Sequence, residues 1–217
     1  MQFKYFVHSI SKPTIMKIFL TVLSFIFLIT NCYSQNSSYE NEIKHFQHKL
    51  NAQYASLKES PLTKEDLKTF KTLDFFDIDE NYCVKATLEL TPDAPFLEMK
   101  TSTERLPLYR KYGIAHFILN GKKCELSIYQ SSDLKTYTNN LFLPYNDISN
   151  GVTTYGGGRF IDLETPTNGS TTIVIDFNKS YNPYCAYNHK YSCPIPPSEN
   201  NLAISILAGV KAFNKKH

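Results

Sequence analysis

The sequence lacks most of the short motifs that identify catalytic and nucleotide-binding sites. It contains no G-x-S-x-G nucleophile elbow, no H-E-x-x-H zinc motif and no cysteine-protease signature. Three consecutive glycines, Gly156 to Gly158, are followed by neither the G-K-[ST] of a phosphate-binding loop nor a predicted helix. Internal repeats, low-complexity tracts and domain linkers are also missing. These absences exclude a hydrolase of the elbow type, a zinc protease and a P-loop protein.

Tryptophan is absent too, and the excess of positive charge is small. The chain still has 15 tyrosines and 15 phenylalanines for a core, and its 217 residues suit one globular domain with appendages. The formal charge of +3 comes from Lys4, Lys12 and Lys17, because residues 1–35 contain no acid. Residues 36–217 are therefore neutral overall. Since nucleic-acid affinity depends on neutralising phosphates, we expect no nucleic-acid partner.

The first 35 residues resemble a secretory signal peptide with an N-terminal extension. Lys17 precedes the apolar run 18–30, which is shorter than the roughly 20 residues of a membrane span. We expect cleavage after Ser34 and an exported protein, periplasmic or secreted, with no transmembrane span in its mature form. Lipid attachment at Cys32 is an alternative, and an uncleaved anchor is another. The oligomeric state has no signature in the sequence.

Two helices are predicted at the start of the mature chain. Residues 36–58 carry one apolar stripe at helical spacing. Its members are Tyr39, Ile43, Phe46, Leu50, Tyr54 and Leu57. Pro61 ends this helix, because proline disfavours helical geometry in the residue before it. Thr63 then caps a short second helix with Asp66 at the capping-box position.

The remainder reads as antiparallel strands. Residues 84–90 alternate between apolar and polar, and Asn120-Gly121 is a two-residue hairpin turn between alternating segments. This register pairs Phe117 with Cys124 and His116 with Glu125, and residues 202–208 form a last strand. We predict a mainly β fold: an antiparallel sandwich or barrel-like sheet with one long and one short N-terminal helix, in a single domain over residues 36–217.

A second predicted hairpin joins residues 159–164 to residues 171–178. If Glu164 pairs with Thr171, Ile161 faces Val174 and Arg159 faces Asp176. Arg159 shares a face with apolar residues, and a buried arginine needs a carboxylate partner. The pair is either an ion pair that fixes the sheet or an anchor for an anionic or hydroxyl-bearing ligand.

Cys185 and Cys193 lie in a proline-rich stretch and are close enough in sequence to close a small loop. Export permits disulfides, so we predict a Cys185–Cys193 bridge. A metal site that adds His189 is the alternative, but the spacing differs from the C-x-x-C of zinc sites. We expect neither a metal nor a cofactor.

Three motifs resemble the family of the domain of unknown function 1684. They are GVTTYGGGRFIDLE at 151–164, DFNKSYNPYCAY at 176–187 and CPIPPSENNLAISILAG at 193–209. The resemblance runs from about residue 46 to residue 213. Val210 stands where the family pattern has a glutamate, which puts in doubt any mechanism that needs that carboxylate. The family implies no established activity.

These motifs supply the candidate ligand-binding residues, which are Asp147, Tyr155, Arg159, Asp176, Asn178, Asn182, Glu199 and Asn200. The first hypothesis is a domain that binds a small polar molecule, such as a sugar or a carboxylate, in a pocket around Arg159 and Asp176. The second is a hydrolase that uses Asp176 with Glu199 or Asp147. A structural envelope protein without a small ligand is the third.

Overall fold

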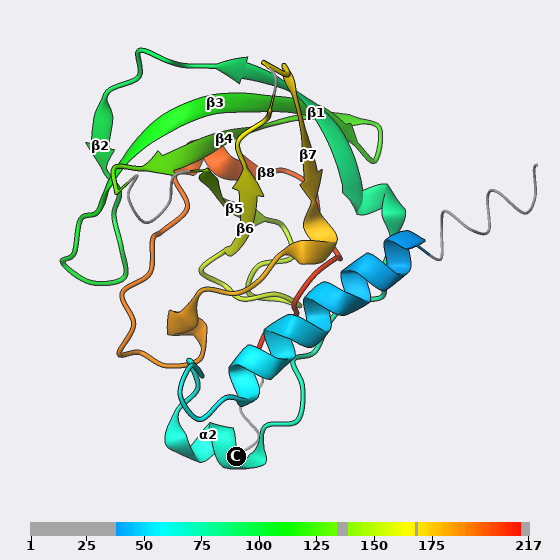
Figure 1. Cartoon of the computed structure of the whole chain (residues 1–217), viewed down its shortest axis with the longest axis vertical. Coiled ribbons are helices and arrows are strands. Elements are labelled where there is room, and N and C mark those ends of the chain that lie inside the picture. The colour runs from blue at the N-terminus through cyan, green and yellow to red at the C-terminus, as the bar shows by residue number, and fades with distance from the viewer. Residues whose placement is uncertain (1–37, 134–138, 168, 214–217) are drawn as a thin grey trace, which may run out of the picture. The chain divides into compact units, whose positions relative to one another are not determined.

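The computed structural model describes residues 38–133, 139–167 and 169–213 (Figure 1). The chain divides into two compact units, one up to Lys44 and one from His45 onward. The predicted signal peptide, with its Ser34 and Cys32 alternatives, lies outside the described residues. Within the described part of the chain, no helix has the length and apolar character needed to cross a membrane.

The first helix spans residues 38–55 and ends earlier than its apolar stripe predicts. Leu57 lies beyond the helix and is 94% exposed, so its assignment to the buried stripe was wrong. The chain turns there instead, because Ser60 donates to the carbonyl oxygen of Tyr54 at 2.6 Å. In the second unit, Leu50 and Tyr54 pack in an apolar cluster with Leu62 and with residues of the next helix.

The second helix, α2 (Lys64–Thr69), confirms the predicted capping box. The Thr63 hydroxyl accepts from the Asp66 amide at 3.1 Å and donates to the Asp66 carboxylate at 2.7 Å. Leu67 and Phe70 contact the apolar cluster.

The second unit is built on one curled antiparallel sheet, a half-barrel (Figure 1). Its strands are β1 (Cys83–Leu90), β2 (Phe96–Glu98), β3 (Leu108–Leu119), β4 (Lys122–Ser131), β5 (Asn140–Asp147), β6 (Arg159–Glu164), β7 (Thr172–Asp176) and β8 (Asn201–Leu202). The order across the sheet is β6-β5-β4-β3-β1-β7, while β2 pairs with β3 and β8 pairs in parallel with β5. Short 3-10 turns connect the later segments: η1 (Glu80–Tyr82), η2 (Phe177–Lys179), η3 (Tyr184–Ala186) and η4 (Ser198–Asn200). The mainly β prediction with few helices is therefore confirmed.

The β3–β4 hairpin has the predicted register. Phe117 pairs with Cys124, and His116 pairs with Glu125. Asn120 and Gly121 have φ angles of 51° and 73°, the positive values that a two-residue turn of this type requires. Cys124 packs against the main core.

The main core lies on one face of the curled sheet. Alternate residues of β1, β3, β4, β5, β6 and β7 supply it, together with the chain after β8. Its most buried members include Ala115, Leu126, Ile128, Leu143, Tyr145, Ile175, Phe177, Ile206 and Ala208. Period-two alternation in the strands explains this distribution, because successive side chains point to opposite faces.

The predicted hairpin between residues 159–164 and 171–178 is wrong. β6 pairs with β5, so Arg159 lies opposite Tyr145, and β7 pairs with β1, so Asp176 lies opposite Cys83. The turn-rich residues between the two segments do reverse the chain, but turn residues alone do not decide which strands pair. β6 and β7 end up at opposite ends of the strand order.

The predicted last strand over residues 202–208 is mostly absent. Only Asn201–Leu202 joins the sheet, and the chain that follows runs through the core without strand partners. Several of its backbone groups bond instead to two side chains: Ile206 and Ala208 accept from Arg159, and the Ile206 amide donates to Asp147. The Ile204 carbonyl oxygen accepts from the Ile148 amide at 3.1 Å. A pattern of apolar residues cannot distinguish this arrangement from a buried strand.

Candidate functional site

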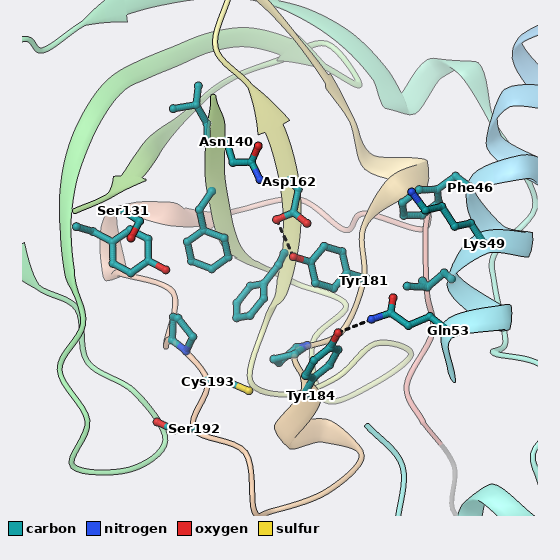
Figure 2. Close-up of a pocket in the computed structure, with 17 residues that line it drawn as sticks. Phe46, Lys49, Gln53, Ser131, Asn140, Asp162, Tyr181, Tyr184, Ser192 and Cys193 are labelled. Atoms are coloured by element: carbon teal, nitrogen blue, oxygen red, sulfur yellow. Dashed lines mark hydrogen bonds between the residues drawn. The ribbon is translucent and has the colours of Figure 1, made fainter. Parts of the chain in front are cut away.

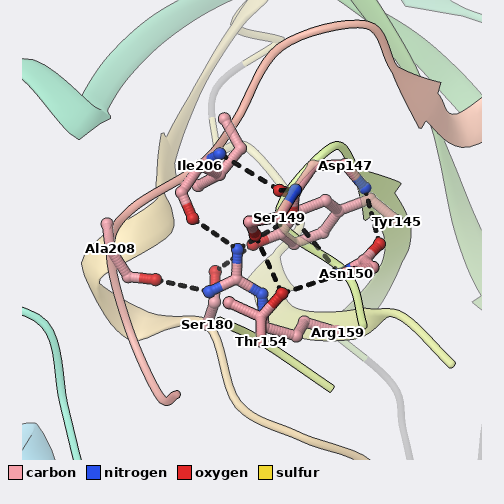
Figure 3. A network of polar contacts seen from close by, with 9 residues as sticks. All are labelled: Tyr145, Asp147, Ser149, Asn150, Thr154, Arg159, Ser180, Ile206 and Ala208. Carbon is pink, nitrogen blue, oxygen red and sulfur yellow. Dashed lines mark hydrogen bonds and ion pairs between the residues drawn. The ribbon is translucent and has the colours of Figure 1, made fainter. Parts of the chain in front are cut away.

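Arg159 is fully buried and has a carboxylate partner other than the predicted one (Figure 3). Its Nη2 lies 2.9 Å from Oδ2 of Asp147, and the Asp147 side chain is also fully buried. Nη1 and Nη2 donate to the carbonyl oxygens of Ala208 and Ile206. The expected Arg159–Asp176 pair does not form, because the two residues are on strands that do not pair.

Asp147 completes this arrangement from the other side. Its Oδ1 accepts from the amides of Ser149 and Ile206 at 2.8 and 3.1 Å. The guanidinium carbon of Arg159 lies 5.4 Å from the centre of the Tyr145 ring, close enough for a cation–π contact. Figure 3 shows the guanidinium enclosed by these groups. The pair therefore fixes the chain after β8 inside the half-barrel and leaves no opening toward a ligand.

Asp176 and Asn178 serve a turn between β7 and η2. Oδ1 of Asp176 accepts from the amide and the side chain of Asn178, both at 3.0 Å. Asn178 in turn bonds the backbone of Asp79, accepting at 3.1 Å and donating at 2.9 Å. Both side chains are buried, so these two candidate residues join the turn after β7 to the backbone at Asp79.

Asn182 and Asn200 are likewise fully buried connectors. Asn200 accepts from the Ser127 amide at 2.8 Å and donates to the carbonyl oxygens of Ser127 and Pro144 at 2.8 and 2.7 Å. Asn182 donates to the Tyr187 hydroxyl and to the carbonyl oxygen of Lys211. These amides satisfy backbone groups that the sheet does not pair.

Glu199 and Tyr155 are the two predicted residues with exposed or half-exposed side chains. Glu199 lies 2.8 Å from both Lys111 Nζ and the Tyr129 hydroxyl, and the hydrogen bond with Lys111 lowers the pKa of Glu199. Tyr155 packs over Gly157, where an added Cβ would lie 2.6 Å from its ring. The Tyr155 hydroxyl lies 3.8 Å from Sγ of Cys185.

The described residues form a cleft of about 610 Å³ elsewhere, on the outer side of β5 and β6 (Figure 2). None of the eight predicted ligand-binding residues lines it. Its lining comes from the first helix, the sheet and the chain between residues 181 and 194: Phe46, Lys49, Leu50, Gln53, Tyr109, Ser131, Asn140, Leu141, Phe142, Phe160, Asp162, Tyr181, Pro183, Tyr184, Ser192, Cys193 and Pro194.

Four aromatic rings follow one another along this cleft. The ring centres of Tyr109 and Phe142 are 5.6 Å apart, those of Phe142 and Phe160 are 4.8 Å apart, and those of Phe160 and Tyr181 are 6.0 Å apart. The register between β5 and β6 brings Phe142 and Phe160 close together, because Phe142 pairs with Asp162 and Pro144 pairs with Phe160. The row gives the cleft an apolar, rigid wall.

A carboxylate stands at the end of this row. The Tyr181 hydroxyl donates to Oδ1 of Asp162 at 2.8 Å. Oδ2 has no hydrogen-bond partner among residues 38–133, 139–167 and 169–213, and the side chain is solvent-exposed within the cleft. Surrounding protein atoms partly desolvate Asp162 and raise its pKa, while burial and this carboxylate raise the pKa of Tyr181. Asp162 thus offers one free acceptor beside an aromatic wall.

The opposite side of the cleft carries polar groups from the first helix. Gln53 donates to the Tyr184 hydroxyl at 2.7 Å, and Lys49 lies one helical turn earlier (Figure 2). Lys49 and Asp162 are of opposite charge, so the lining is neutral overall apart from its weakly acidic phenol and thiol groups.

Cys185 and Cys193 are both free and largely buried, and Cys193 lines the cleft. The Cys185 amide lies 3.1 Å from Sγ of Cys193. Their predicted bridge therefore remains a prediction. In the part of the chain that the structure describes, no cluster of three or more His, Cys, Asp or Glu side chains is suited to a metal ion.

The cleft is lined by other residues than the eight candidates that the sequence suggests. In β6 the prediction followed Arg159, Ile161 and Leu163, whereas the cleft uses the opposite face, Phe160 and Asp162. A signal was available: an aromatic residue stands where alternation expects a polar one.

The protein family described as "Protein of unknown function (DUF1684)" matches residues 68–211. The chain belongs to the DUF1684 family. The match covers the strands and the segment that runs through the core, so the recognised resemblance is confirmed. It assigns no activity, because the family is defined as one of unknown function.

One solved structure has a similar fold. The solution NMR structure of the uncharacterized protein from gene locus rrnAC0354 of Haloarcula marismortui is 28% identical, with a TM-score of 0.67. The alignment covers 85% of this chain and 99% of that one. Among curated proteins, none matches.

Val210, at the position where the resemblance predicts a glutamate, is an apolar core residue in this chain. It is 2% exposed and packs with Tyr54, Leu73 and Tyr187, while its amide donates to the Ser180 carbonyl oxygen at 2.9 Å. This position therefore supplies packing here and no carboxylate.

Proposed function

We propose that this protein binds a small, neutral, hydroxyl-bearing ring compound, of the carbohydrate class, in the cleft beside Asp162. The observation that carries the proposal is the free Oδ2 of Asp162 at the end of four aromatic rings. The apolar face of a sugar ring can lie against such rings while its hydroxyls donate to a carboxylate. Pockets that combine apolar walls with few polar groups are typical of small-molecule sites.

The charges of the cleft favour a neutral ligand. Lys49 and Asp162 compensate each other, so neither a strongly anionic nor a strongly cationic molecule has an unbalanced counter-charge there. This supports a sugar over the organic carboxylate that the sequence left open. The site proposed around Arg159 and Asp176 gives way to this cleft, since both of those side chains are buried in hydrogen bonds.

A hydrolase finds less support. Glycoside hydrolysis uses two carboxylates about 5–10 Å apart. Among the described residues, Asp162 is the one carboxylate that lines the cleft, while Asp147 and Asp176 are occupied in buried contacts. The proposal also includes export of the protein, which rests on the signal-like character of residues 1–35. N-terminal sequencing of protein recovered from cells would test whether this segment has been removed.

The binding experiment is a thermal-shift screen of neutral mono- and disaccharides, with organic acids and amines as comparison sets. A sugar at about 100 times its Kd would stabilise the protein by about 2.7 kcal/mol. Asp162→Asn and Phe142→Ala should both reduce the shift, whereas Glu199→Gln, an exposed acid outside the cleft, should leave it unchanged.

Two results would refute the proposal. The first is no shift with any sugar while the protein is folded. The second is a sugar-dependent shift that survives both cleft substitutions, because the ligand would then bind elsewhere. A shift confined to organic acids would replace the sugar with an anionic ligand.

A further inference from the structure

The thiols of Cys185 and Cys193 form an isolated, well-supported pair. The Cys185 amide points at Sγ of Cys193 from 3.1 Å, and the Tyr155 hydroxyl lies 3.8 Å from Sγ of Cys185. A backbone N–H at a sulfur stabilises the thiolate form, as does a nearby hydroxyl. Each sulfur therefore has its own donor in addition to the other cysteine.

The backbone around Cys193 is held in place. Its amide donates to the Ser102 hydroxyl at 3.2 Å, and its carbonyl oxygen accepts from the Ser102 amide at 2.9 Å. The neighbouring Pro194 forms a bridge with Thr101. On the other side, Cys185 belongs to the turn η3, where the Ala186 amide donates to the Pro183 carbonyl oxygen at 2.9 Å. The contact between the Cys185 amide and the Cys193 sulfur is therefore held by fixed backbone on both sides.

The cleft contacts one member of the pair. Cys193 lines the cleft (Figure 2), whereas Cys185 does not. A small molecule in the cleft therefore contacts Cys193 and not Cys185.

We propose that Cys185 and Cys193 are a dithiol that exchanges reversibly with low-molecular-weight disulfides, with Cys193 as the attacking sulfur and Cys185 as the resolving one. This goes beyond ligand binding and does not depend on it. The interaction with Cys193 lowers the pKa of Cys185, and the interaction with Cys185 raises the pKa of Cys193, so the first proton leaves Cys185. Transfer of the remaining proton from Cys193 to Cys185 then gives the Cys193 thiolate, the sulfur on the side of the cleft.

The exchange has two steps. The Cys193 thiolate attacks one sulfur of RS–SR, forming Cys193–S–SR and releasing RS⁻, while Cys185 keeps the transferred proton. Cys185 passes this proton to RS⁻, giving RSH, and its thiolate then attacks the Cys193 sulfur. The products are the Cys185–Cys193 disulfide and a second RS⁻, so two electrons move from the protein to the small disulfide.

Cys83 and Cys124 are natural controls. Cys124 lies on β4, is partly buried against the core, and burial raises its pKa. Neither residue lines the cleft. A difference in reactivity between Cys193 and Cys124 thus reports on the pair rather than on thiols in general.

The test treats the full chain with hydroxyethyl disulfide and locates each cysteine's modification by peptide mass mapping. In the wild type we expect a Cys185–Cys193 disulfide that dithiothreitol reduces, forming roughly tenfold faster than any adduct on Cys124. Cys185→Ser should accumulate a stable adduct on Cys193, because the resolving sulfur is missing. Cys193→Ser should leave Cys185 slow to react.

Three outcomes would overturn the proposal. One is a wild-type protein in which Cys124 is modified while Cys185 and Cys193 stay reduced. Another is a bridge that dithiothreitol cannot reduce in the folded protein. The third is rapid adduct formation on Cys185 in Cys193→Ser, which would reverse the order of attack. The wild-type measurement stands even if a variant fails to fold.

Discussion

The guanidinium of Arg159 donates to the carbonyl oxygen of Ile206 at 2.8 Å, across 47 residues of sequence. The same Nη2 contacts Asp147 at 2.9 Å, and Asp147 in turn accepts from the Ile206 amide. Both polar groups of one backbone residue are thus satisfied by a single ion pair. This replaces the strand partner that a buried segment would otherwise need.

Removing one member of this ion pair should be severely destabilising. Arg159→Leu leaves the Asp147 carboxylate buried without its counter-charge, together with two unpaired carbonyl oxygens. We expect a loss of about 3–5 kcal/mol in the free energy of unfolding, measured by urea denaturation. Lys111→Leu, which breaks the partly exposed pair with Glu199, should cost less than about 1 kcal/mol. Equal losses in the two variants would contradict the structural role of Arg159.

Asn200 should be nearly as sensitive as Arg159 although it is uncharged. Asn200→Ala removes the partners of three backbone groups, the Ser127 amide and the carbonyl oxygens of Ser127 and Pro144. An unsatisfied buried group costs about 1–3 kcal/mol, so the variant should lose at least about 2 kcal/mol in urea unfolding. Asn201→Ala, next to it and exposed, is the matched control. A loss below that of the control would show that water replaces these bonds.

Alanine substitutions at Gly158 and Gly156 should differ in their effect on stability. Gly158 has a φ of +85°, and an added Cβ would lie 2.5 Å from the Asn146 side-chain oxygen and 2.8 Å from the Tyr145 carbonyl oxygen. Gly156 has no positive φ, and its nearest contact would be 3.7 Å away. Gly158→Ala should therefore cost more than about 1 kcal/mol, while Gly156→Ala should be neutral or slightly stabilising. Thermal unfolding of both variants measures this difference in stability. Similar melting temperatures would contradict the strain that we expect from a side chain at position 158.

The pH dependence of stability should report on Asp162. Desolvation raises its pKa in the folded protein, so the folded state keeps this proton to higher pH than the unfolded chain does. Its favourable contribution is present below the unfolded pKa of about 3.9 and is lost as pH rises through the folded pKa. Asp162→Asn, which keeps an acceptor for Tyr181, should therefore gain stability relative to the wild type as the pH rises above about 4.

Urea unfolding of both proteins across this range is the measurement. Glu199→Gln should show the opposite trend, because the pKa of Glu199 is lowered and its contribution is lost as pH falls. A stability difference between Asp162→Asn and the wild type that does not change with pH would show that Asp162 is fully solvated.

The sequence predicted local features well and long-range ones poorly. The Asn120-Gly121 turn and the Thr63 cap follow from backbone preferences of a few neighbouring residues, and both are confirmed. The pairing of residues 159–164 was wrong because it depends on which distant strand completes the curled sheet. The carboxylate requirement of Arg159 was correct, but its partner was not, since Asp147 reaches it through the β5–β6 register.

The cleft could not be predicted from the sequence for a related reason. Polar residues in the family motifs, such as Asn178 and Asn200, draw attention as ligand contacts, yet they satisfy buried backbone. The cleft instead combines Gln53, Phe142, Asp162 and Tyr181, which no spacing rule brings together. Only the fold of the later segment over the outer side of β5 and β6 makes them neighbours.

The segment after β8 has a consequence for synthesis of the chain. Ile204, Ile206 and Ala208 fill the interior of the half-barrel, yet they follow all of its strands in the sequence. While a ribosome still holds these residues, Arg159 and Asp147 lack their partners at Ile206 and Ala208, and the apolar interior stays open to water. Chains truncated before Ile204 should therefore fail to fold compactly and be degraded by proteases, even though they contain every strand of the sheet.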